Sequence, residues 1–189
     1  MKKVIYILLI ATSLLVTACS NSSDKKNNDE KQITTKKETV ATQSNDILLK
    51  DTEGNIITAT KTDKGYTFSN AKGKIVLISF FATWCPPCKA EIPHLNNLQE
   101  KYKNKLSIIG ILLEENKDND EMKKFINYYA INYTISNSLG NQKLATAVGG
   151  VSNIPYMIMY GKDGHYITNY LGAVPEEMVD SDIESALKK

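Results

Sequence analysis

The chain has no arginine: all 23 basic residues are lysines, which nearly balance 21 acidic residues to a formal charge of +2. Arginine binds phosphate and guanine best because its planar guanidinium presents a fork of donors. Nucleic-acid-binding domains also gather their basic residues in a patch or stripe, and this sequence has none. We therefore exclude nucleic acid as a partner.

Long apolar runs are also rare, and the first lies at the N-terminus. Two lysines precede Val4–Val16, a stretch too short for a comfortable bilayer span. Leu15–Cys19 resembles a bacterial lipobox, which implies cleavage before Cys19 and diacylation of its thiol. We predict a signal peptide at 1–18 and a lipid-anchored protein of the cell envelope, facing the periplasm or extracytoplasmic space. An uncleaved anchor, or a signal peptide with a chance cysteine, would also place the domain outside the cytoplasm.

Cysteine is scarce as well, with three in the chain. Lipidation of Cys19 leaves Cys85 and Cys88 as the thiols of the mature protein. A framework of several structural disulfides is therefore excluded. The remaining pair is either the working pair or a local staple.

The chain divides into a tether and one domain. Residues 20–45 have almost nothing to bury, so with lipidated Cys19 we predict a disordered tether at 19–45. Such a tether lets a membrane-fixed domain reach distant partners. Residues 46–189 have the pattern of a single folded domain.

Apolar periodicity predicts an α/β domain: a central mixed β-sheet flanked by helices, with an N-terminal β-hairpin extension. The run at 75–81 is nearly unbroken and typical of a strand buried on both faces. Expected strands are 47–50, 55–60, 65–68, 75–81, 106–113, 156–160 and 166–171. Expected helices run from 85 to about 101–104, then over 121–129, 141–148 and 175–187.

Cys85 and Cys88 lie where the apolar run gives way to a helical pattern, with Pro86 and Pro87 between them. A thiol attacks as its thiolate, and a free cysteine with a pKa of about 8.5 is mostly protonated at neutral pH. The first turn of a helix stabilises the anion, and Cys85 lies where that turn begins. Cys88 is one turn later, close enough to attack a mixed disulfide at Cys85. The pattern predicts a redox-active Cys85–Cys88 disulfide and no other cofactor.

Other sites built on two cysteines fit less well. Structural zinc needs four ligands, whereas the mature chain offers two cysteines, His94 and a distant His165. Covalent c-type haem needs a histidine after the second cysteine, where this chain has Lys89. A purely structural disulfide in so short a loop adds little. A soft-metal module binding Cu(I) through two thiolates stays open without a supporting Met or His cluster. We predict no metal site.

These residues resemble a known family. From about residue 46 to 189, the chain resembles the thioredoxin-like proteins of the bacterial cell envelope known as the TlpA/ResA type. The resemblance rests on Phe80-Phe81-Ala82-Thr83-Trp84-Cys85-Pro86-Pro87-Cys88-Lys89-Ala90-Glu91-Ile92-Pro93, then Ile154-Pro155 and Lys162-Asp163-Gly164. The motifs follow in the expected order, so the resemblance implies a thioredoxin-like fold.

The resemblance also assigns roles at the dithiol. Cys85 would be the exposed nucleophile and Cys88 the resolving thiol, supported by Trp84, Pro86 and Pro87. The two prolines stiffen the loop, and the first suits a helical turn because its missing N–H needs no partner there.

Substrate binding is assigned to Ile154 and Pro155. Pro155 would be the family's cis-proline, packed beside the dithiol, and Ile154 would offer its backbone to a substrate peptide as an added strand. The alternative is an ordinary trans proline at a strand start.

Glu91 corresponds to an acid that tunes the thiols in the envelope family. Its carboxylate would oppose thiolate formation and can accept or deliver a proton during exchange. The alternative is a surface glutamate in the first helical turn. Ser79 takes the place of the buried aspartate of cytoplasmic thioredoxins, which leaves Glu91 as the obvious acid near the pair. We expect His94 to act as a cap or face solvent.

The resemblance implies a membrane-anchored thiol–disulfide oxidoreductase that reduces protein disulfides in the envelope. It suggests apocytochrome c as the client and a membrane thiol-reducing protein as the donor. Strong oxidants place a histidine between the cysteines, whereas this chain has two prolines, so we predict reduction. An envelope oxidant or isomerase is the alternative. A peroxidase of the related peroxiredoxin type is disfavoured because it needs an arginine beside its cysteine.

The lipobox leads to a direct test. Cys19→Ala removes the thiol that would be acylated, so we expect the protein to move from the membrane fraction to the soluble fraction. Immunoblotting of fractionated cells measures this shift. Persistent membrane association of the variant would rule out the lipid anchor.

Overall fold

The computed structural model describes residues 46–115 and 117–188. The signal peptide, Cys19 and tether lie outside these residues, so those predictions stay predictions. In the described part of the chain, no helix is long and apolar enough to cross a membrane. The elements are β1 (Asp46–Lys50), β2 (Ile56–Thr62), β3 (Gly65–Phe68), β4 (Ile75–Phe81), α1 (Pro86–Lys101), β5 (Leu106–Leu112), α2 (Asn119–Tyr128), β6 (Thr134–Ser136), α3 (Gly140–Ala147), β7 (Tyr156–Tyr160), β8 (Tyr166–Leu171) and α4 (Glu176–Leu187).

Two sheets form the domain. The central one has the order β6-β5-β4-β7-β8, with β4, β5 and β6 parallel and β7 and β8 antiparallel to their neighbours. The other is antiparallel, in the order β1-β2-β3. The mixed sheet and the N-terminal hairpin are confirmed. Strand β6 was not predicted, because three residues are too few to show a period.

Strand β4 is the buried centre of the domain, and all seven of its residues are buried. Its side chains alternate between the faces, as the pleat requires. Val76, Ile78 and Phe80 join the cluster that includes the three-stranded sheet. Ile75 and Leu77 join the cluster that includes α1 and α4. A nearly unbroken apolar strand therefore supplies both cores.

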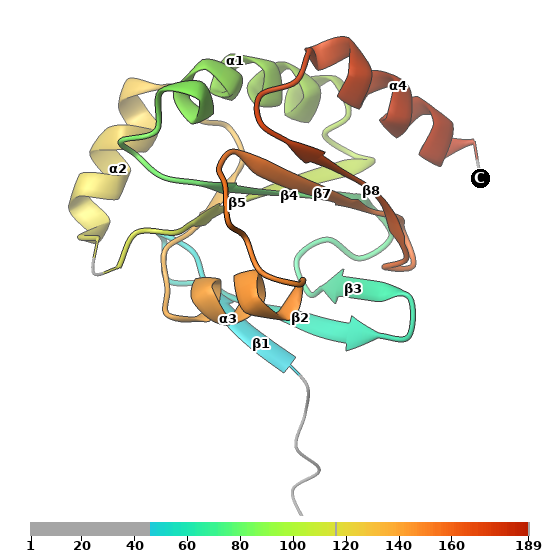
Figure 1. The fold of residues 1–189 in the computed structure, drawn as a ribbon, viewed down its shortest axis with the longest axis horizontal. Coiled ribbons are helices and arrows are strands. Elements are labelled where there is room, and N and C mark those ends of the chain that lie inside the picture. Colours follow the sequence, from blue (N-terminus) through green and yellow to red (C-terminus); the bar gives the residue numbers. More distant parts are fainter. Residues whose placement is uncertain (1–45, 116, 189) are drawn as a thin grey trace, which may run out of the picture. The chain divides into compact units, whose positions relative to one another are not determined.

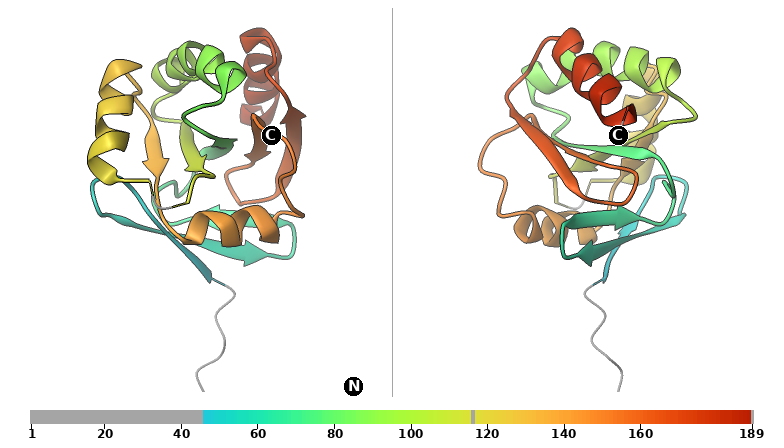
Figure 2. Two further views of the ribbon diagram at one scale, coloured as in Figure 1. Left: turned by 60° about the vertical axis from the view of Figure 1, so that its left-hand side comes forward. Right: turned by 90° about the vertical axis from the view of Figure 1, so that its right-hand side faces the viewer.

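The helices cover both faces of the central sheet. Helices α1 and α4 lie on one face, and α3 lies with the three-stranded sheet on the other (Figure 1). Helix α2 stands beside α1 (Figure 2). Asn141 fixes α3, because its buried Nδ2 donates to the carbonyls of Leu112 and Ser136 at 2.9 and 2.8 Å. From the carboxyl end of β4, a short segment leads to α1 on one face of the sheet.

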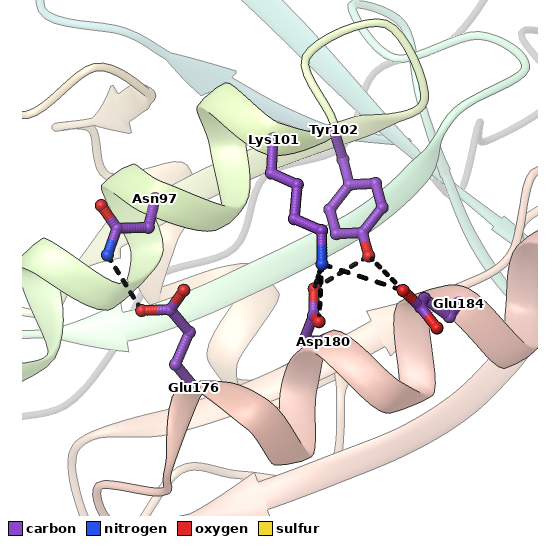
Figure 3. Close-up of polar contacts among 6 residues, drawn as sticks. All are labelled: Asn97, Lys101, Tyr102, Glu176, Asp180 and Glu184. Carbon is purple, nitrogen blue, oxygen red and sulfur yellow. Dashed lines mark hydrogen bonds and ion pairs between the residues drawn. The ribbon is translucent and has the colours of Figure 1, made fainter.

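A polar seam joins α1 to α4 (Figure 3). Lys101 Nζ lies 2.7 Å from both carboxylate oxygens of Asp180, and the Tyr102 hydroxyl donates to Asp180 at 2.8 Å. The Asp180 carboxylate raises the pKa of Lys101, and the ammonium lowers the pKa of Asp180. Closer to the N-terminus of α4, Asn97 Nδ2 donates to Glu176 at 3.0 Å. The seam sets how α4 lies along α1.

Candidate active site

The site begins at the junction of β4 and α1. Cys85 is the N-cap of α1, and its Sγ accepts a hydrogen bond from the backbone N–H of Cys88 at 3.3 Å. The two cysteines form a disulfide, with their Cα atoms 5.3 Å apart. Pro86 and Pro87 occupy the first helical turn, where their missing N–H groups remove no bond. The attacking sulfur thus lies at the positive end of the helix dipole.

Burial of the dithiol corrects one expectation. Cys85 was expected to be exposed, but in the disulfide form it is 2% exposed and Cys88 is 4% exposed. The reason is that the bonded sulfurs pack into an apolar cluster with Phe81, Ala82 and Ile92. Exposed apolar residues surround them instead, namely Trp84, which is 67% exposed, and the prolines between the cysteines.

The loop before β7 meets the dithiol from the other side. Its Ile154–Pro155 peptide bond is cis. Ile154 packs against the cluster that contains both cysteines, and Pro155 is buried. The Pro155 carbonyl accepts a hydrogen bond from the Gly172 N–H at 2.9 Å. The structure therefore brings together the dithiol and the residues assigned to substrate binding.

Glu91 lies one helical turn after Cys88 and is only 3% exposed. The alternative of a surface glutamate is therefore wrong. Burial raises the pKa of Glu91 to about 7, while the nearby Val174 backbone and His94 oppose the rise. Its Oε1 has no hydrogen-bond partner and is the one such buried side-chain N or O atom among the described residues. A carboxyl with this pKa can both take up and release a proton at neutral pH.

Ser79 and Tyr133 lie on the same side of the central sheet as α1. Ser79 is 3% exposed and, by the alternation of β4, lies on the face covered by α1. Burial raises the pKa of the Tyr133 phenol, and the Glu91 carboxylate raises it further, so both groups favour their neutral forms. His94 faces solvent as expected, but its Nδ1 also lies 3.0 Å from Glu176 Oε2.

Sequence reasoning missed one contact at the mouth of the site. A carboxylate oxygen of Glu114, just after β5, accepts a hydrogen bond from the backbone N–H of Thr83. Lys117 lies 3.6 Å from the same carboxylate. Because the carboxyl ends of adjacent parallel strands meet at one edge of a sheet, the positions of Thr83 and Glu114 were a usable signal. The contact holds the loop that leads to Trp84 and Cys85.

Known proteins match this arrangement. The sequence profile of the Redoxin family matches residues 24–187. The chain belongs to the Redoxin family. The thiol-disulfide oxidoreductase ResA of Bacillus anthracis is 30% identical over 135 residues, covering 71% of this chain and 74% of that protein. The ResA of Halalkalibacterium halodurans is 25% identical over 142 residues, covering 75% and 74%.

Solved structures share the fold. A putative thiol:disulfide interchange protein DsbE from Chlorobium tepidum has a TM-score of 0.61 and 22% identity, covering 76% of this chain and 94% of that chain. StoA from Bacillus subtilis has a TM-score of 0.57 and 19% identity, covering 72% and 95%. The thioredoxin-like fold is thus confirmed. This Redoxin-family chain is a thiol–disulfide oxidoreductase of the ResA type.

The buried acid makes the stability of this Redoxin-family domain depend on pH. The pKa of Glu91 rises from 4.5 to about 7 on folding, so its favourable contribution is complete below pH 4.5 and is lost as pH rises through about 7. The free energy of unfolding should fall by up to about 3 kcal/mol across this window. Glu91→Gln should remove that fall.

Urea unfolding with the disulfide intact measures the effect at pH 4.5 and at about pH 8. Glu177→Gln is the control, because Glu177 is exposed on α4. Between the two pH values, the control should lose as much free energy of unfolding as the wild type. A Glu91→Gln variant with the same loss of stability as the wild type would show that Glu91 is not the titrating group.

Proposed function

We propose that the protein reduces disulfides in envelope proteins through Cys85 and Cys88, with Glu91 as the proton acceptor for the resolving thiol. The observation that carries the proposal is the position of Glu91, a carboxyl buried one helical turn from the resolving cysteine, where burial raises its pKa to about 7. A proton acceptor works best when its pKa lies near the working pH.

The exchange has two steps that balance. The Cys85 thiolate attacks a client disulfide, forms an intermolecular S–S bond and releases one client thiolate, which takes up a proton. Cys88 then gives its proton to Glu91 and attacks the Cys85 sulfur. The mixed disulfide breaks, the second client sulfur leaves as a thiolate that takes up a proton, and the Cys85–Cys88 bond closes. Two electrons pass from the protein to the client.

Two features support the reductive direction. A carboxylate beside the dithiol disfavours the thiolate, and no histidine lies between the cysteines to stabilise it. Both effects destabilise the ionised reduced state, and a less stable reduced form gives up its electrons more readily. The exposed Trp84 and the loop at Ile154 and Pro155 would receive the client peptide as an added strand.

We also propose lipid anchoring at Cys19, with apocytochrome c as client and a membrane thiol-reducing protein as donor. The lipobox and the tether composition support the anchor. The similarity to ResA-type proteins supports an envelope client. The donor would return two electrons to the disulfide after each cycle.

Trapping tests the order of the two steps. Cys88→Ser removes the resolving thiol, so we expect mixed disulfides through Cys85 to accumulate in cells. Non-reducing electrophoresis after acid quenching detects them as heavier species that disappear with reductant. Cys85→Ser is the matched control and should trap far less. Equal trapping by the two variants, or none by either, would contradict the assignment of the nucleophile.

The reduction potential tests the direction. We expect a midpoint below about −200 mV at pH 7, because strong oxidants of this superfamily lie near −120 mV. Equilibration with glutathione buffers, followed by thiol alkylation, measures it. A value near that of the strong oxidants would identify an envelope oxidant or isomerase instead.

A further inference from the structure

The loop between β8 and α4, residues 172–175, and the first residue of α4 make contacts at every second residue. Gly172 donates its backbone N–H to the Pro155 carbonyl at 2.9 Å and has a φ of 79°, which glycine adopts readily. The backbone of Val174 lies near the buried carboxylate of Glu91 and lowers the pKa of that group. Glu176 then contacts α1. The loop therefore touches the cis-proline, the buried acid and the outer surface of α1 in turn.

Glu176 is the anchor at the far end of this loop. Its Oε2 lies 3.0 Å from His94 Nδ1 and accepts a hydrogen bond from Asn97 Nδ2 at 3.0 Å (Figure 3 shows the second contact). The Glu176 side chain is 26% exposed, so water only partly weakens these contacts. Pro175 fixes the backbone just before it, with a φ of −58°. A displacement of Glu176 would therefore be transmitted to Val174.

We propose that Glu176 is a positioning residue for the buried acid: by binding His94 and Asn97, it holds the 172–175 loop against α1 so that the Val174 backbone meets the Glu91 carboxylate. The role of Glu91 in proton transfer rests on the proposed function, whereas the positioning itself does not. The surroundings explain why one contact matters, since Glu91 Oε1 has no partner and the carboxylate has few stabilising neighbours.

The titratable and polar groups near Glu91 come from three segments of the chain. His94 on α1 and the Val174 backbone lower the pKa of its carboxyl, against the larger effect of burial. The Glu91 carboxylate in turn raises the pKa of the Tyr133 phenol, just before β6. The Cys85–Cys88 disulfide carries no charge. Loss of the Glu176 anchor should weaken the two stabilising contacts, so the pKa of Glu91 should rise.

The test is a pH titration of the Glu91 carboxyl in the oxidised full chain, purified in detergent. Carbon-13 NMR of the glutamate side-chain carboxyls follows it, and the Glu91→Gln variant assigns the signal. In Glu176→Ala we expect the midpoint to rise by about one pH unit from the wild-type value. The matched control is Asp180→Ala, which removes a carboxylate one turn further along α4 and breaks the 2.7 Å contacts with Lys101.

The control separates positioning from general docking of α4. Asp180→Ala should lower stability but leave the Glu91 midpoint in place. An equal shift in both variants, or no shift in Glu176→Ala, would overturn the proposal. If circular dichroism shows that Glu176→Ala does not fold, Glu176→Gln decides. It keeps an acceptor for Asn97 but loses the charge facing His94, so a smaller upward shift is expected and an unchanged midpoint would overturn the proposal.

A kinetic measurement separates this proposal from the proposed function. In Glu176→Ala, the pH profile of client disulfide reduction should move upward with the Glu91 titration. If the wild type reduces no disulfide, the proposed function fails, while the carboxyl titration still decides the role of Glu176.

Discussion

The burial of β4 on both faces is the constraint from which the site follows. A strand enclosed in this way is also hydrogen-bonded along both edges, to β5 and to β7, so the end of the strand has a fixed position. Helix α1 begins five residues after Phe81, and its first turn is therefore fixed as well. The position of the strand therefore places the Cys85 sulfur beside the unpaired N–H groups of that turn.

The second consequence of this core is an acid where water is excluded. The α1 face that packs against the sheet carries Cys88, Glu91, Ile92 and Leu95, so the helix buries a carboxyl among groups that favour its neutral form. The protein does not neutralise this group with a lysine, as it does for Asp180 in the seam. Glu91 lies on α1 and Asp180 on α4, and their pKa shifts are opposite, because Glu91 meets apolar surroundings and Asp180 meets an ammonium.

Much of this could be predicted from the sequence. The strand at 75–81, the helix after it and the dithiol between them each have a strong local pattern, and the family motif located the proline of the Ile154–Pro155 pair. The burial of Cys85 and Glu91 could not be predicted, because it depends on how α2 and the loops before β6 and α4 pack. Those segments are short or irregular. Val174 acts through its backbone, and a backbone contact cannot be predicted from the type of residue. Glu114 lay between these cases, since its contact follows from strand order.

The exposure of Trp84 has an optical consequence. It is the single tryptophan of the chain and is 67% exposed, one residue before the reactive cysteine. An indole in water emits at longer wavelength than one covered by a partner, so a client that docks over the dithiol changes the emission of a single fluorophore. The native chain thus carries its own spectroscopic label beside the reacting sulfur, and client encounter can be followed in real time without an added dye.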